Sequence, residues 1–171
     1  LRYRQGKRGN YATRKHYFSE WISDNEQQGL LTEVTASLPK AKSQRRDIDF
    51  MTTHRTLYPQ LAASEALTDS LRQVEKLLSA QTTWYVPKGS IHKAYEGLRH
   101  GDIVAFTCNK KGLDIFHCGF VWWPNPAYSE PRLLHASSVV GHVTLTPVPL
   151  AEYAQSIDMC SGIRVMRLND K

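Results

Sequence analysis

The stretch GDIVAFTCNKKGLDIFHCGFVWWPNPAYSEPRLLHASS, residues 101–138, decides the fold. Turn residues divide it into three apolar runs, 103–106, 115–121 and 132–138, whose length and composition are typical of β-strands. Two prolines, Pro124 and Pro126, lie between the second and third runs, and neither could donate to a central ladder. The pattern predicts three successive strands joined by a turn and a longer loop.

Two histidines lie on the second and third predicted strands. Because strand side chains alternate, His117 and the other odd-numbered residues of 115–121 share one face, while Cys118 and the even-numbered residues share the other. A hairpin centred on Pro126 would place His117 directly opposite His135, with about 5 Å between their Cβ atoms. One imidazole could then orient the other as the base for a Ser or Cys nucleophile. Two ordinary strand histidines with backbone or solvent partners are the alternative.

The motifs around these histidines resemble those of the NlpC-type cell-wall cysteine peptidases, papain-like enzymes of bacterial envelopes. The resemblance rests on the Gly101-Asp102 strand, on His117-x-Gly119-Phe120-Val121 and on Leu134-His135-Ala136-Ser137. The flanking motifs YFSEWI (17–22) and DFMTTH (49–54), followed by Leu57-Tyr58-Pro59, are similar to a narrower branch that is N-acetylmuramoyl-L-alanine amidase-like. Together these motifs cover nearly the whole chain.

The resemblance implies a fold and roles for both histidines. The fold is α+β, a papain-like antiparallel sheet of five or six strands with helices packed on one side, and residues 1–171 form a single domain. His117 is the implied catalytic base and His135 the residue that orients it. The implied activity is hydrolysis of the amide between N-acetylmuramic acid and L-alanine in peptidoglycan or its fragments.

The nucleophile has no match in the sequence. The family's cysteine stands at a helix start before these strands, where the helix dipole lowers its pKa. Cys108, Cys118 and Cys160 all lie downstream of that position, and we expect all three to be structural, with Cys108 the least implausible substitute. Because residue 1 is Leu, we expect a fragment that lacks the nucleophile helix. If the natural protein does begin there, it is a pseudoenzyme.

Length and composition are ordinary for one globular domain. The 171 residues are 41% hydrophobic and 22% charged, and no apolar run approaches the roughly 20 residues of a spanning helix. The 22 basic and 16 acidic residues give a net charge of +6, concentrated in residues 2–15 and 40–46. No nucleic-acid-binding motif accompanies the basic clusters, and the peptide carboxylates of peptidoglycan are also an acidic partner. We therefore expect peptidoglycan or muropeptides as the partner, with no nucleic acid and no membrane span.

Periodic segments flank the central strands. Apolar spacing predicts helices over 15–28 and 64–78, the second capped by Ser64, and alternation predicts strands at 143–146 and 162–168. Residues 30–60 show no clear period and read as a loop or site wall. From this part and its neighbours, four residues are predicted to line a cleft, although structural hydrogen bonds would explain each equally well: Arg14, His16, His54 and Tyr58.

Several functional alternatives remain at this point. A zinc site from His117, His135 and His142 is conceivable, but His142 belongs to the next strand, so we expect no metal and no cofactor. A stem-peptide endopeptidase, a non-catalytic peptidoglycan-binding module and a nucleic-acid or acidic-surface binder are the other classes. The resemblance implies a location in the bacterial cell envelope, periplasmic or secreted, with any signal peptide outside this chain.

Overall fold

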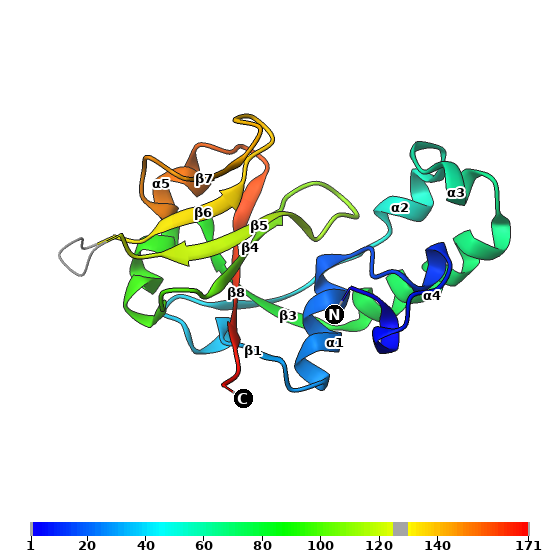
Figure 1. Cartoon of the computed structure of the whole chain (residues 1–171), viewed down its shortest axis with the longest axis horizontal. Coiled ribbons are helices and arrows are strands. Elements are labelled where there is room, and N and C mark those ends of the chain that lie inside the picture. Colours follow the sequence, from blue (N-terminus) through cyan, green and yellow to red (C-terminus); the bar gives the residue numbers. More distant parts are fainter. Residues whose placement is uncertain (1, 125–129, 171) are drawn as a thin grey trace.

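The computed structural model describes residues 2–124 and 130–170, and an antiparallel sheet forms its centre (Figure 1). The sheet has eight strands among the described residues, in the order β2-β3-β8-β4-β5-β6-β7, and the remaining strand, β1, pairs with β8. The strands are β1 (Leu31–Glu33), β2 (Lys42–Arg45), β3 (Thr82–Pro87), β4 (Ile103–Cys108), β5 (Ile115–Trp122), β6 (Arg132–Ala136), β7 (Val143–Leu145) and β8 (Cys160–Leu168).

Short helices connect and cover these strands. The α-helices are α1 (Phe18–Gln27), α2 (Phe50–Thr53), α3 (Pro59–Ala62), α4 (Glu65–Ala80) and α5 (Leu150–Gln155). The 3-10 helices are η1 (Arg4–Gly6), η2 (Tyr11–Thr13), η3 (Thr35–Ser37), η4 (Arg55–Leu57) and η5 (Lys88–Gly97). Figure 1 shows α2, α3 and α4 beside the sheet, with α1 between α4 and the strands. No helix among the described residues is long and apolar enough to cross a membrane.

The α+β class is as predicted, but the expected five or six strands are too few. The three runs of the 101–138 stretch form β4, β5 and β6, which are neighbours in the sheet. The additional strands β1 and β2 lie within residues 30–60, where we expected a loop. They span three and four residues, too few for an alternating pattern to be visible in the sequence. The prolyl loop around Pro126 lies outside the described residues.

Helices cover both faces of the sheet, so the expectation of helices on one side is wrong. All six residues of β4 are buried, which requires cover on both faces of this central strand. Val104 and Phe106 pack in one core with residues of η5 and α5. Ile103 and Ala105, on the opposite face, pack with Ile22 of α1.

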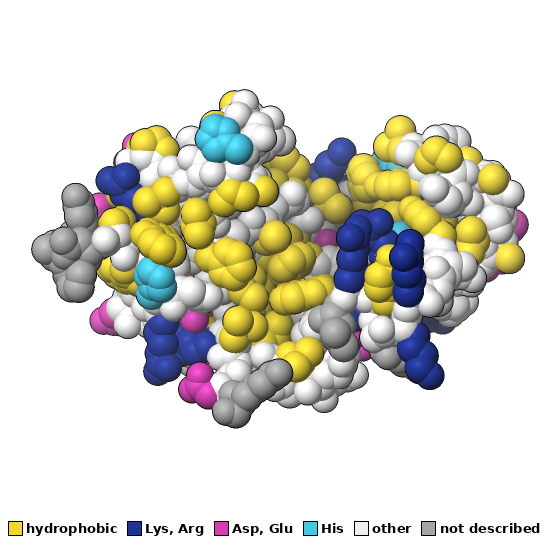
Figure 2. Space-filling model, viewed as in Figure 1, with side chains coloured by type: hydrophobic (Ala, Val, Ile, Leu, Met, Phe, Trp, Pro, Cys, Tyr) yellow, Lys and Arg dark blue, Asp and Glu magenta, His cyan; other side chains and the backbone are white. Residues whose placement is uncertain are grey.

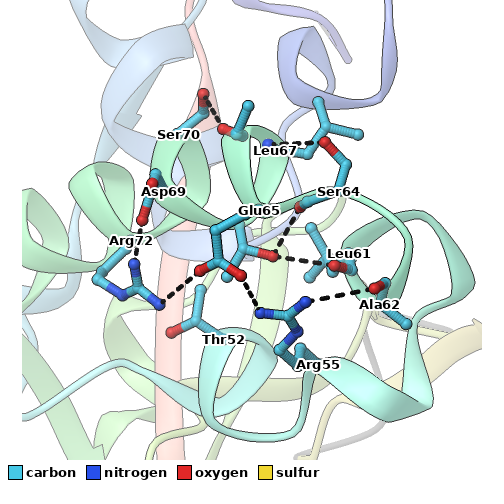
Figure 3. Close-up of polar contacts among 12 residues, drawn as sticks. Thr52, Arg55, Leu61, Ala62, Ser64, Glu65, Leu67, Asp69, Ser70 and Arg72 are labelled. Carbon is cyan, nitrogen blue, oxygen red and sulfur yellow. Dashed lines mark hydrogen bonds and ion pairs between the residues drawn. The ribbon is translucent and has the colours of Figure 1, made fainter.

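The predicted helix at 64–78 is α4, and polar contacts join its start to the preceding turns (Figure 3). Ser64 Oγ accepts a hydrogen bond from the Leu67 N–H at 3.3 Å, which confirms the predicted cap. Glu65 pairs with Arg55 of η4, and Arg55 also donates to the Ala62 carbonyl at 3.3 Å. These contacts fix the segment that carries Tyr58.

A buried hydrogen-bond network joins α2 and α4 to the start of α1. The Tyr17 hydroxyl donates to Glu75 Oε1 at 2.6 Å and accepts from the Met51 N–H at 2.9 Å. Thr52 N–H donates to the same Glu75 oxygen at 3.1 Å. Burial, and then the hydrogen bond to Glu75, raise the pKa of Tyr17. The network holds the N-terminal segment and residues 50–58 on the side of the molecule where β5 begins.

Candidate active site

A β-bulge in β5 sets the direction of His117. Phe106 pairs with His117 but Thr107 pairs with Ile115, so Phe116 is an extra residue in β5. The bulge reverses the alternation: Ile115 packs with the α1 side of the sheet, whereas Phe116 packs against the core that contains Phe106. The prediction that Ile115 shares a face with His117 and that Phe116 lies on the opposite face is therefore wrong. A bulge next to a candidate active site is a common way to redirect a side chain.

The two histidines of β5 and β6 form a hydrogen-bonded pair. His117 Nε2 lies 2.7 Å from His135 Nδ1, and the two ring planes cross at 85°. Direct opposition of the two residues was wrong, because Phe120 pairs with Leu134 and the register, continued by one residue, places His135 opposite Gly119. The imidazoles therefore meet diagonally. The predicted hairpin, centred on Pro126, would instead place His117 opposite His135.

Gly119 makes this diagonal contact possible. A Cβ at residue 119 would lie 2.7 Å from the Leu134 carbonyl oxygen and 3.0 Å from the His135 Cβ. Real Cβ atoms do not tolerate such distances to backbone atoms, so any side chain here would displace β6 or His135. A lone glycine inside an apolar strand run signals a close approach of this kind.

Burial keeps both imidazoles neutral at neutral pH. His135 is 7% exposed, and His117 is half-buried. Burial lowers the pKa of His135, while burial and then the charge of His135 lower the pKa of His117. Because His117 uses Nε2 toward His135, its Nδ1 is the nitrogen left to accept a proton. Tyr153 of α5 packs edge-on against His135, with 5.2 Å between ring centroids.

His117 opens into a pocket of about 590 Å³ between β5 and the N-terminal segment. Three of the four predicted cleft residues line this pocket with His117, namely Arg14, His16 and Tyr58. His54 does not: it stacks on Phe50 at 4.2 Å and lines a separate pocket of about 350 Å³. Figure 2 shows Lys and Arg side chains gathered over the N-terminal segment, beside hydrophobic side chains over the strands. The roles of these residues in binding stay predictions.

Local contacts hold His16 in the pocket wall. Its Nε2 lies 2.9 Å from the Tyr11 carbonyl oxygen, and the Tyr11 and His16 rings are 4.3 Å apart. Burial is the main reason why the pKa of His16 is lowered, so the imidazole is neutral at neutral pH. A neutral His16 donates to the Tyr11 carbonyl oxygen. This contact agrees with the alternative that His16 makes a structural hydrogen bond and does not bind substrate.

The three cysteines are placed unfavourably for nucleophilic attack. Cys108 is fully buried, and its Sγ accepts from the Lys110 N–H at 3.2 Å. Cys160 is also buried, and burial raises the pKa of its thiol. Cys118 is exposed and lines the same pocket as His117, but it projects from the other face of β5, and partial desolvation raises the pKa of its thiol. A nucleophilic cysteine needs the opposite shift.

Metal ligands do not gather in the part of the chain that the structure describes. Among residues 2–124 and 130–170, no three His, Cys, Asp or Glu side chains lie close enough to hold a metal ion. His142, the third histidine of the zinc alternative, is exposed in the turn before β7. Within these residues, His117 and His135 therefore have no third side chain that could complete a metal site with them.

Comparison with known proteins identifies the family. A family model described as "AmiA-like: N-acetylmuramoyl-L-alanine amidase-like" matches residues 1–163. The match spans the whole sheet as far as β8, including both histidines and the pocket. The chain belongs to this amidase-like family of peptidoglycan hydrolases. No functionally curated protein matches it.

Several solved structures are similar to this chain. An N-acetylmuramoyl-L-alanine amidase from Bacteroides uniformis is 34% identical, with a TM-score of 0.91 over 99% of this chain and 70% of that one. A putative xylanase from Bacteroides fragilis is 35% identical, with a TM-score of 0.89 over 98% of this chain and 72% of that one. A Legionella pneumophila protein shares the fold at 23% identity, with a TM-score of 0.67 over 99% of this chain and 66% of that one.

Proposed function

We propose that the protein hydrolyses the amide between N-acetylmuramic acid and L-alanine in peptidoglycan or its fragments. The 2.7 Å contact between His117 Nε2 and His135 Nδ1, at the wall of a pocket, carries this proposal. It supplies a base whose ring orientation is fixed by a second, buried polar side chain. The family and the Bacteroides uniformis structure supply the bond.

The proposed chemistry is that of a cysteine hydrolase. The thiol gives its proton to Nδ1 of the neutral His117, and the resulting thiolate, paired with protonated His117, attacks the amide carbonyl. His117 then gives its Nδ1 proton to the departing amine of L-alanine, which leaves the muramoyl group on the sulfur as a thioester. Water that His117 deprotonates then hydrolyses this thioester and regenerates the thiol, while His135 holds the His117 ring through Nε2 in both steps. Backbone N–H groups near the nucleophile stabilise the oxyanion. Because Cys108, Cys118 and Cys160 are placed unfavourably, we propose that the thiolate belongs to a part of the natural polypeptide outside residues 1–171.

The pocket favours this chemistry over hydrolysis of a glycosidic bond. Glycosidases generally use two carboxyl groups on either side of the bond that is cleaved. Among the described residues that line the pocket, Asp114 is the one carboxylate. The putative xylanase activity of the Bacteroides fragilis relative is therefore not proposed for this chain.

Defined muropeptides test the proposed bond. We expect the full natural polypeptide to release a peptide with a new amine on L-alanine, and His117→Asn to lower the rate about 100-fold or more. His92→Asn, which changes an exposed histidine away from the pocket, is the matched control. A new amine inside the stem peptide would instead establish an endopeptidase. Binding of muropeptides without any cleavage would establish a non-catalytic binding module.

Thiol labelling tests the proposed nucleophile. We expect iodoacetamide to modify one cysteine outside residues 1–171 much faster than Cys108, Cys118 and Cys160, and to abolish cleavage. Intact-mass measurement and peptide mapping locate the label. Slow labelling at these three cysteines alone, with cleavage retained, would contradict the thiolate mechanism.

A further inference from the structure

The described residues satisfy only one oxygen of the buried Asp114 carboxylate. Asp114 is 6% exposed, lines the pocket, and stands three residues before His117. Its Oδ2 accepts a hydrogen bond from the Ser19 N–H at 3.0 Å, at the start of α1. Its Oδ1 has no hydrogen-bond partner among the described residues. A buried carboxylate oxygen without a donor is unfavourable, so a donor from a ligand would satisfy it.

An unpaired cation lines the same pocket. Arg14 is exposed, and within residues 2–124 and 130–170 its guanidinium has no hydrogen bond or ion pair. A guanidinium binds carboxylates through two parallel hydrogen bonds. Arg14 comes from the segment before α1, whereas Asp114 comes from the turn before β5. The pocket therefore presents, on different segments, one group that needs a donor and one that binds an anion.

We propose that this pocket binds the peptide part of the substrate through two side chains, Asp114 and Arg14. An N–H group of the peptide donates to Asp114 Oδ1, and a free carboxylate of the peptide pairs with Arg14. The choice of a cell-wall peptide rests on the proposed function. A pocket of about 590 Å³ has the usual size for a ligand of this kind. The arrangement favours peptides with a free carboxylate over the corresponding carboxamides.

Asp114 also borders a much smaller cavity, which gives the competing explanation. That cavity, of about 20 Å³, is lined by Ser19 and Arg164 as well as Asp114. It is large enough for about one water molecule. A water there could satisfy Oδ1, and Asp114 would then serve only to hold the start of α1. The two explanations predict different effects of the same substitution.

Calorimetric titration of the full natural polypeptide with two probes separates these explanations. The probes are L-alanyl-D-glutamate and its diamide, which lack the N-acetylmuramoyl amide and are therefore not cleaved by the proposed amidase. We expect Asp114→Asn to weaken binding of L-alanyl-D-glutamate about tenfold or more, with the melting temperature unchanged. Asparagine keeps one oxygen for the Ser19 N–H and turns an NH₂ group toward the donor of the peptide. Asp158→Asn, an exposed site with the same loss of charge, should bind as wild type.

Arg14 tests the other half of the proposal. Arg14→Gln should remove the preference for L-alanyl-D-glutamate over its diamide, whereas Arg99→Gln at another exposed arginine should keep it. Wild-type affinity in Asp114→Asn, with or without a lower melting temperature, would overturn the proposal, as would a wild type that binds neither probe. Peptide binding that depends on Asp114, in a protein that cleaves no muropeptide, would support it while refuting the proposed amidase.

Discussion

His135 reaches His117 diagonally, over a glycine, rather than from directly across the strand. The 2.7 Å contact between the two rings depends on the position of His135 beside Gly119, where a Cβ would lie 3.0 Å from that of His135. The contact between the two histidine rings therefore also depends on Gly119. This relationship suggests how the proposed base could be disabled without changing either histidine.

Gly119→Ala should disrupt the imidazole pair. The added methyl group would meet the Leu134 carbonyl oxygen at 2.7 Å, so β6 must shift and carry His135 with it. We expect a loss of activity of about 100-fold, as for a misplaced catalytic group, and a loss of stability of about 1–3 kcal/mol. Muropeptide cleavage and urea unfolding measure the two effects.

Gly89→Ala is the matched control for this substitution. A Cβ at residue 89 would meet no atom within 4 Å, and Gly89 is exposed in η5. This variant should keep activity and stability close to wild type. Equal activity of Gly119→Ala and wild type would show that the pair does not depend on the glycine.

Stability should fall when the solution becomes mildly acidic. The pKa values of His16, His117 and His135 are all lowered in the folded protein, so below the ordinary value of 6.5 the unfolded chain binds more protons. The stability these groups contribute is fully present above pH 6.5 and is lost as the pH falls from there toward their folded values. Urea unfolding at pH 7.5, 6.5 and 5.5 measures the decline.

His135→Asn should make this decline smaller. The substitution removes one buried imidazole and also removes the charge that acts on His117. His142→Asn, at an exposed position, is the control and should decline as wild type does. A decline in His135→Asn as steep as in wild type would mean that other groups cause the acid sensitivity.

Tyr17→Phe should destabilise the part of the molecule that carries the pocket wall. It removes the donor to Glu75 Oε1 and the acceptor of the Met51 N–H, both in the interior. Leaving buried polar groups without one partner costs about 1–3 kcal/mol. Tyr85→Phe is the control, since the Tyr85 hydroxyl has no hydrogen bond in the described part of the chain. Urea midpoints that are equal for both variants would count against the network.

Asp102→Ala should be among the most destabilising changes. Asp102 is 2% exposed, accepts from Arg167 at 2.8 and 2.7 Å, and accepts from the Arg99 N–H at 2.8 Å. Removal of one partner of a buried ion pair costs about 3–5 kcal/mol. The midpoint of urea unfolding measures this loss, with Asp158→Ala as the exposed control. A loss below about 1 kcal/mol would show that solvent replaces the carboxylate.

Local patterns in the sequence were sufficient for part of this structure. The strands of the 101–138 stretch, the helix that begins after Ser64 and the placement of His117 and His135 on neighbouring strands could all be predicted. Strand alternation, turn residues and helix caps depend on neighbours a few residues apart, so a single sequence records them. The three- and four-residue strands β1 and β2 are too short to leave such a record.

The tertiary structure alone decided how these pieces form a site. The bulge at Phe116, the diagonal histidine pair and the role of Gly119 all arise from register between strands. Arg14 and Asp114 both line one pocket although 100 residues separate them along the chain. Side-chain packing determines such contacts between distant segments, and no local pattern contains that information.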